Sequence, residues 1–171
     1  MKKQVAVIFG GKSSEHEVSC HSVLNVIKGF SPEKYEIHLI GITKEGHWIY
    51  VPEAAAIEDG SWYDGRKTAI ISPDAVNSGI YLCDDEGHYE RRKIDVIFPV
   101  LHGKFGEDGT IQGVFEMSGI PYVGCGVLSS SVSMDKISTK IFVEKLGIRQ
   151  AKFVADIAQD LSELDHTVAE V

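Results

Sequence analysis

The feature that most constrains the fold is the apolar run Val5–Phe9, which ends abruptly in Gly10-Gly11. A short apolar run bounded by a turn signal is typical of a strand buried on both faces. The stretch Glu17–Phe30 then shows apolar residues at roughly helical spacing, and Tyr35–Thr43 has the character of a second strand. A strand, a helix and a strand in this order predict an α/β fold with a parallel sheet flanked by helices. We expect Ser13 or Ser14 to cap the helix.

The middle of the chain, residues 44–93, is interrupted by glycine and proline at short intervals. Short runs such as His47–Val51 and Gly79–Leu82 lie between these breaks. The pattern predicts a small β-rich lobe, built of short strands or hairpins and inserted into the α/β frame. Its periodicity indicates no chemistry.

A third strand is expected at Asp95–Leu101, and it leads into the polar segment His102–Gly109. A helix should follow, because Ile111, Val114, Phe115 and Ser118 share one helical face, and Gly119 is a natural stop. Tyr122-Val123 is a short apolar pair, which predicts a short strand.

The remaining segment predicts three elements. A helix is expected over residues 129–146, with its apolar residues facing inward (Met134, Ile137, Ile141 and Phe142). Residues 151–157 are expected to form a strand, and Asp160 or Ser162 to cap a last helix that runs to Val171.

Composition excludes several functional classes. The formal net charge of −8 argues against nucleic acid as a main partner, because phosphate binding needs a basic surface. The cysteines, Cys20, Cys83 and Cys125, are widely spaced, so neither a zinc site nor a disulfide framework is indicated. The start has too short an apolar run for a signal peptide, and no stretch is apolar enough to cross a membrane. We therefore expect a cytoplasmic protein.

Two loops lie where an open parallel sheet binds ligands, beyond the carboxyl ends of its strands. They are Gly10–Glu17 and His102–Gly109. The first loop lacks the leading glycine of a P-loop and the GxGxxG pattern of dinucleotide-binding proteins, so we reject both. His16 and His21 are five residues apart rather than four, and they would not share a zinc ion on one helix face.

The loop side chains keep two interpretations each. Glu15 either satisfies the positive end of a helix or binds a substrate ammonium group. His102 either makes a hydrogen bond within its turn or takes part in chemistry, and its place opposite Glu15 favours the second interpretation. Glu107 and Asp108 are solvated acids or caps of the following helix, and for Asp108 we expect a cap.

Three segments resemble the signatures of D-alanine–D-alanine ligases. They are Val7–Ser19, His102–Gly113, and Gly119–Gly126 continued to Met134-Asp135-Lys136. Their order matches that family, and the resemblance extends over essentially the whole chain, weakest at residues 44–93. Ligases that join D-alanine to D-serine or D-lactate share these motifs, so they remain alternatives.

The resemblance implies a Rossmann-like (pre-ATP-grasp) domain over residues 1–133 and the start of an ATP-grasp central domain over 134–171. The family joins two D-alanines for peptidoglycan through an acyl phosphate, using ATP and magnesium. It implies that Glu15 contacts the ammonium of the first D-alanine as a catalytic-site residue. His102 would hold that substrate's carboxylate or acyl phosphate, and Lys136 would reach ATP. The family also implies a homodimer.

This sequence departs from the family in length, since members are considerably longer. We expect the groups that bind most of the phosphates and magnesium to lie outside it, so no metal ligand is assigned in this chain. We expect the 171-residue chain to have no ligase activity alone. A non-catalytic amino-acid-binding module on the same fold is the alternative from another class.

Overall fold

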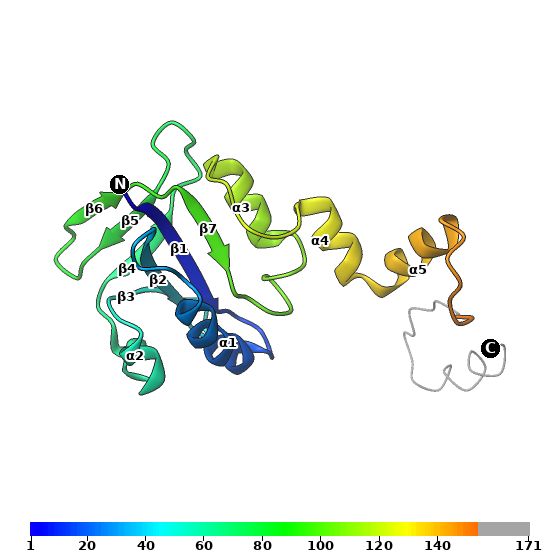
Figure 1. Ribbon diagram of the computed structural model, residues 1–171, viewed down its shortest axis with the longest axis horizontal. Coiled ribbons are helices and arrows are strands. Elements are labelled where there is room, and N and C mark those ends of the chain that lie inside the picture. The colour runs from blue at the N-terminus through cyan, green and yellow to red at the C-terminus, as the bar shows by residue number, and fades with distance from the viewer. Residues whose placement is uncertain (154–171) are drawn as a thin grey trace. The chain divides into compact units, whose positions relative to one another are not determined.

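The computed structural model describes residues 1–153 (Figure 1). The helices and strands are β1 (Lys3–Gly10), α1 (His16–Lys28), β2 (Tyr35–Ile42), β3 (Trp48–Val51), α2 (Ala55–Glu58), the 3₁₀ helix η1 (Ser61–Asp64), β4 (Thr68–Ile71), β5 (Ile80–Cys83), β6 (Tyr89–Arg92), β7 (Val96–Pro99), α3 (Thr110–Ser118), α4 (Val127–Met134) and α5 (Lys136–Lys145). The chain divides into two compact units, residues 1–131 and 132–171, and each is described by itself.

The first unit is built on one seven-stranded sheet with the order β6-β5-β4-β3-β2-β1-β7. Strand β1 is parallel to β2 on one side and to β7 on the other. The expected α/β fold with parallel strands flanked by helices is confirmed, and the three strands predicted from apolar runs are its centre. The β-rich segment expected at residues 44–93 joins the same sheet, because β3 to β6 extend it in antiparallel fashion from the edge of β2.

Strand β1 supplies both hydrophobic layers of the unit. Val5, Val7 and Phe9 pack into the cluster on one face of the sheet, while Ala6 and Ile8 pack into the cluster on the other. All five are at most 1% exposed. The alternation follows from the period of two in a strand, and it explains why the run is apolar without a break.

Helices cover the two faces of the sheet. Val23 of α1 joins the cluster of Val5 and Val7, whereas Ile111 and Phe115 of α3 join the opposite cluster. Helix α3 ends where predicted, since Gly119 adopts the left-handed conformation at its C-cap. The short strand expected at Tyr122-Val123 is a single parallel bridge between Tyr122 and Ile97.

Helix α1 begins differently from the prediction. Its N-cap residue is Glu15, whose side chain makes no capping hydrogen bond. Ser13 does not cap the helix; its hydroxyl accepts a hydrogen bond from the backbone N–H of Glu15 at 3.0 Å, which closes a tight turn before the helix. The prediction of Ser13 or Ser14 as the cap is therefore wrong.

The single helix predicted over residues 129–146 is also wrong, because Asp135 divides it. Asp135 has extended backbone angles, and its carboxylate accepts a hydrogen bond from the N–H of Ser138 at 2.6 Å. Its preference for an N-cap outweighs the continuous apolar pattern, so α4 ends and α5 starts anew. The residues expected to face inward are exposed, namely Met134, Ile137, Ile141 and Phe142.

Two predicted elements fall wholly or mainly beyond residue 153. Residues 151–153 form no strand, and the rest of the strand expected at 151–157 lies outside the described residues. The last predicted helix, from Asp160 or Ser162 onward, lies outside them as well. Over the part of the chain that is described, no helix is long and apolar enough to cross a membrane.

Candidate substrate site at the carboxyl ends of β1 and β7

The first loop leaves β1 through two glycines with left-handed backbones, Gly10 at φ 83° and Gly11 at φ 103°. A side chain on Gly10 would overlap the carbonyl oxygen of Ile42, the last residue of β2. The N–H of Gly11 donates to that same carbonyl at 2.8 Å. The sequence therefore needs glycine here, because only glycine combines this conformation with so close an approach of two backbones.

Ser19, on the first turns of α1, joins this loop to the end of β7. It is fully buried, and its hydroxyl accepts from the N–H of Gly10 at 2.7 Å while donating to the carbonyl of Val100. One side chain thus satisfies two backbone groups from separate strand ends, which would otherwise be buried without partners.

His16 is a second buried anchor of the first loop. Its ring is fully buried, Nδ1 lies 2.8 Å from the carbonyl oxygen of Gly11, and Nε2 lies 2.6 Å from the hydroxyl of Tyr63. The sequence suggests only a zinc site for His16, and its spacing from His21 rules that out. The signal that could have revealed the anchor is the spacing of His16, Ser19 and Val23, which places three buried residues on one face of α1.

The second loop is a compact turn held by its own acids. Glu107 accepts a hydrogen bond from the N–H of Gly103 at 2.7 Å. Asp108 accepts from the N–H groups of Phe105 and Thr110, at 2.8 and 3.0 Å. Burial alone would raise the pKa of Asp108, but these backbone donors outweigh it and hold the pKa below its usual value. The prediction that Asp108 caps α3 is wrong, because the N-cap residue is Gly109, although the Asp108 carboxylate still binds the N–H of Thr110, the first residue of the helix.

Phe105 is the only residue other than glycine with a positive φ in the described chain, at 66°. Such a conformation costs energy in a bulky residue, and the carboxylate of Asp108 that binds its N–H helps to hold it. Strained backbone of this kind concentrates at ligand-binding loops, which marks the second loop as a candidate site.

The structure brings the Glu15 and His102 loops together. A Cβ atom on Gly103, the residue after His102, would lie 2.7 Å from Oε2 of Glu15 and 2.7 Å from the hydroxyl of Ser13. The Glu15 carboxylate therefore lies directly against the backbone of the second loop. This juxtaposition follows from the parallel pairing of β1 with β7, which ends both strands at the same edge of the sheet.

His102 faces a pocket of about 310 Å³. Its Nε2 atom is buried and has no hydrogen-bond partner within residues 1–153. A polar atom in this state is available to a ligand, because burial without a partner costs free energy that a bound group can recover. The pocket is lined by Gly11, Lys12, Ile42, Gly46, Trp48, Leu101, His102, Lys104, Phe105, Gly106, Thr110, Ile111 and Val114, and Glu15 is not among these residues.

Two lysines and two residues from β3 and its preceding turn belong to this wall. Lys12 and Lys104 come from the two loops, and they make the pocket favourable to an anionic group. Gly46 and Trp48 come from the segment for which the sequence indicated no chemistry. A short β-rich segment gives no periodic signal for such a role.

Lys136, predicted to reach ATP, lies in the second unit. It is the exposed first residue of α5, directly after the capping Asp135. Its role therefore stays a prediction.

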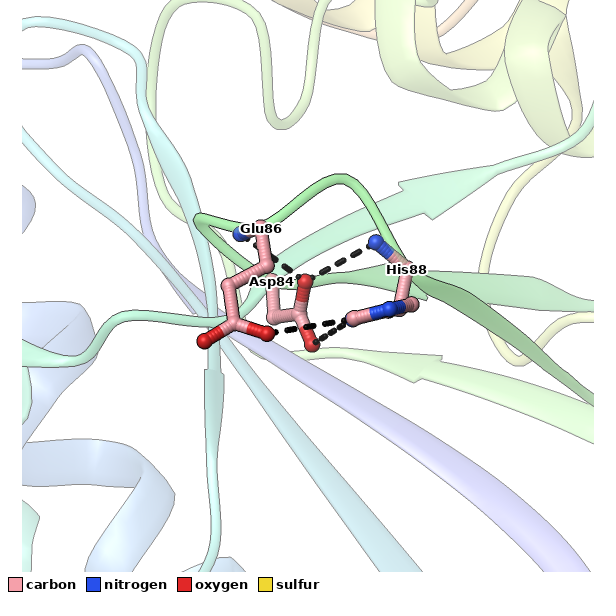
Figure 2. A network of polar contacts seen from close by, with 3 residues as sticks. All are labelled: Asp84, Glu86 and His88. Carbon is pink, nitrogen blue, oxygen red and sulfur yellow. Dashed lines mark hydrogen bonds and ion pairs between the residues drawn. The ribbon is translucent and has the colours of Figure 1, made fainter.

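The network drawn in Figure 2 is a β-turn between β5 and β6. Oδ1 of Asp84 accepts from the N–H groups of Glu86 and His88, at 3.1 and 2.9 Å, and Oδ2 lies 3.3 Å from Nδ1 of His88. These contacts shape an exposed turn. Among residues 1–153, no group of three or more His, Cys, Asp or Glu side chains is arranged to hold a metal ion.

An open sheet with two loops that meet beyond the carboxyl ends of adjacent parallel strands places the chain in the class of α/β proteins, and comparison with known proteins narrows it. Residues 4–125 match the family described as the D-ala D-ala ligase N-terminus. The chain belongs to this family.

A D-alanine–D-alanine ligase of Acetivibrio thermocellus is 46% identical over 166 residues, which cover 90% of this chain and 44% of that protein. The crystal structure of the VanG D-Ala:D-Ser ligase from Enterococcus faecalis superposes with a TM-score of 0.82 at 36% identity, over 99% of this chain and 48% of that one. A Bacillus anthracis D-alanine–D-alanine ligase complexed with ATP superposes with a TM-score of 0.55 at 29% identity, over 96% of this chain and 44% of that one. The chain thus spans just under half the length of these relatives.

Proposed function

We propose that this chain supplies the half-site for the first D-alanine in an ATP-dependent ligase. That ligase joins two D-alanines into the dipeptide of peptidoglycan through an acyl phosphate. The observation that carries the proposal is the meeting of the Glu15 carboxylate with the His102 loop at the carboxyl ends of two adjacent parallel strands.

The strand order supports this location. Strand β1 pairs with β2 on one side and with β7 on the other, so the chain crosses to opposite sides of β1. In open α/β sheets such a change of direction leaves a crevice beyond the strand ends, and ligands bind there. Both proposed residues follow these strands.

The chemistry of the two side chains fits an amino acid. The Glu15 carboxylate is exposed next to Gly103 and suits an ammonium group by charge. The unpartnered Nε2 of His102, with Lys12 and Lys104 on the same pocket, suits the substrate carboxylate and the acyl phosphate that replaces it. Glu15 therefore holds and orients the amino end, while His102 stabilises the reacting end.

ATP and magnesium belong to the proposal through the family. Lys136 is proposed to contact ATP, and residues 134–171 to begin the ATP-grasp central domain, with residues 1–133 as the Rossmann-like domain. The exposed apolar residues of α5, such as Ile141 and Phe142, support a helix that packs on further protein. Magnesium supplies charge neutralisation during phosphoryl transfer when bound, and the described residues offer it no ligand set.

The complete protein is further proposed to work in the cytoplasm as a homodimer, without nucleic acid or a membrane as partner. The net charge of −8 supports the exclusion of nucleic acid. Light scattering of the purified ligase checks the dimer, and a monomeric mass at micromolar concentration would contradict it.

The molecule that accepts the first D-alanine defines the product of the ligase. Because the VanG relative is named a D-Ala:D-Ser ligase, a ligase that joins D-alanine to D-serine or D-lactate is the alternative product class. Product analysis with each acceptor at equal concentration separates these possibilities. A non-catalytic binding module would instead bind D-alanine in calorimetry with no effect of ATP.

The test of the half-site is Glu15→Gln in the complete ligase. Loss of the negative charge should raise the KM for the first D-alanine by roughly 10-fold or more, since a charge-assisted hydrogen bond contributes about 1.5–3 kcal/mol. The KM for ATP should change less. Glu58→Gln, at an exposed position of α2, is the matched control. Equal effects on both substrates, or none, would reduce Glu15 to a residue of the helix start.

A further inference from the structure

The ring of His16 joins two segments that are distant in the sequence. Nδ1 lies 2.8 Å from the carbonyl oxygen of Gly11, in the first loop, and Nε2 lies 2.6 Å from the hydroxyl of Tyr63, in η1. The ring of His16 is fully buried, whereas Tyr63 is 43% exposed. His16 directly follows Glu15, which makes this ring the nearest support of the proposed ammonium-binding residue.

The chemistry of the partners fixes the protonation pattern of a neutral His16. A carbonyl oxygen only accepts hydrogen bonds, so Nδ1 carries the proton and donates to Gly11. Nε2 is then an acceptor, and the hydroxyl of Tyr63 donates to it. Burial raises the pKa of Tyr63 to about 12, which keeps the hydroxyl in its donating form.

Tyr63 is itself held in place by aromatic packing. Its ring stacks on Trp62 with centroids 4.0 Å apart, and Trp62 is buried against Phe9 of β1 at 5.0 Å. The ring of Trp62 also fills the space over Gly41 of β2, where a side chain would overlap it. Packing on Trp62 thus places the Tyr63 hydroxyl beside Nε2 of His16.

We propose that Tyr63 is a positioning residue for the first D-alanine, which acts through His16 and the Gly11 carbonyl to hold Glu15 against the second loop. The inference rests on the proposed function and extends it to the inserted segment. Tyr63 holds the ring of His16 through the hydrogen bond to Nε2, and His16 holds the glycine turn before Glu15 through the hydrogen bond to the Gly11 carbonyl. The segment 44–93 thereby contributes to substrate binding without lining the Glu15 side of the site.

The first experiment reads the tautomer directly and does not depend on activity. Long-range ¹⁵N–¹H correlation spectra of this chain should show His16 with its proton on Nδ1, and His16→Gln identifies its signals. Tyr63→Phe should shift the Nε2 resonance of His16, whereas Tyr81→Phe should not, because the hydroxyl of Tyr81 bonds to the Asn77 carbonyl in an exposed part of the same segment. A proton on Nε2, or no shift in Tyr63→Phe, would overturn the proposal.

The second experiment measures kinetics in the complete ligase. Tyr63→Phe should raise the KM for the first D-alanine by about 5-fold, the equivalent of one hydrogen bond, with kcat and the KM for ATP nearly unchanged. Tyr81→Phe should leave all three constants unchanged. Parallel changes in the constants for both substrates, or loss of thermal stability alone, would make Tyr63 merely structural and refute a positioning role.

The two experiments separate the proposals from each other. If Glu15→Gln leaves D-alanine binding intact, the proposed half-site fails, while the Nε2 resonance of His16 in Tyr63→Phe still reports whether Tyr63 holds the His16 ring. If Glu15→Gln behaves as expected and Tyr63→Phe behaves like Tyr81→Phe, only the positioning role fails.

Discussion

Oε2 of Glu15 lies so close to the backbone of Gly103 that a Cβ atom added there would be 2.7 Å from it. The carboxylate and the glycine come from different loops, and each loop has hydrogen bonds of its own. Gly103 also has φ 70°, a conformation that favours glycine. The contact is therefore sensitive to a single added methyl group.

Gly103→Ala should displace the Glu15 carboxylate and raise the KM for the first D-alanine in the complete ligase by about 10-fold or more, equivalent to at least ~1.4 kcal/mol. Gly87→Ala is a matched control, because Gly87 also has a positive φ, at 84°, but its Cβ would meet no atom within 4 Å. Steady-state kinetics of both variants measure the KM for the first D-alanine. If both variants are destabilised equally and neither changes the KM for the first D-alanine, the Glu15–Gly103 contact does not affect substrate binding.

Ser19→Ala should destabilise the chain by about 1–3 kcal/mol, because it leaves the buried N–H of Gly10 and carbonyl of Val100 without partners. Ser129→Ala removes an exposed serine with one long hydrogen bond of 3.3 Å and should change stability by less than about 0.5 kcal/mol. Chemical denaturation of both variants measures the difference. Equal midpoints would show that water replaces the Ser19 hydroxyl.

Gly41→Ala should destabilise the chain by about 1–3 kcal/mol, because the new methyl group would overlap the ring of Trp62 and lie 2.9 Å from Phe9. The same substitution at Gly113, in α3, meets no atom within 4 Å and should stabilise the chain by about 0.5–1 kcal/mol. Thermal unfolding should therefore move in opposite directions for the two variants. A shift in the same direction would contradict the packing of Trp62 over β2.

His38 should make stability fall as the pH drops below 6.5. Burial lowers the pKa of His38 from 6.5, and the positive charge of Arg92 lowers it further. Just below pH 6.5 the unfolded chain therefore binds a proton at His38 more readily than the folded chain does, which favours unfolding. The neutral ring donates from Nε2 to Oε1 of Gln4 at 2.7 Å, while the buried Nδ1 has no partner within residues 1–153.

Denaturation of His38→Gln at several pH values below 6.5 should show a weaker dependence of stability on pH than the unmodified chain shows. His21→Gln, on the exposed side of α1, is the control. An unchanged slope in His38→Gln would mean that His38 protonates equally in the folded and unfolded states.

The central strands and the two loops could be predicted because their sequence signals are strong and local. Val5–Phe9 is apolar without a break, and the polar residues Glu15 and His102 follow strands that end together. The support of these loops could not be predicted, since it comes from side chains of other segments. Tyr63 lies in a single 3₁₀ turn with no periodicity, and its partner His16 is revealed only by the fold.

Asp135 shows a different limit. The apolar residues around it continue the helical period, yet one short carboxylate bond to the N–H of Ser138 starts a new helix. Periodicity and capping chemistry compete at such a residue, and the pattern alone does not say which one dominates.

The placement of the β5–β6 hairpin at the end of the sheet has a consequence for evolution and for engineering. Strands β5, β4, β3 and β2 separate β6 from β1, so changes in the hairpin do not move the strand ends that carry Glu15 and His102. Length variation among relatives is expected to accumulate at its exposed Asp84–His88 turn. The same turn is suited to the insertion of an affinity tag or a fluorescent reporter.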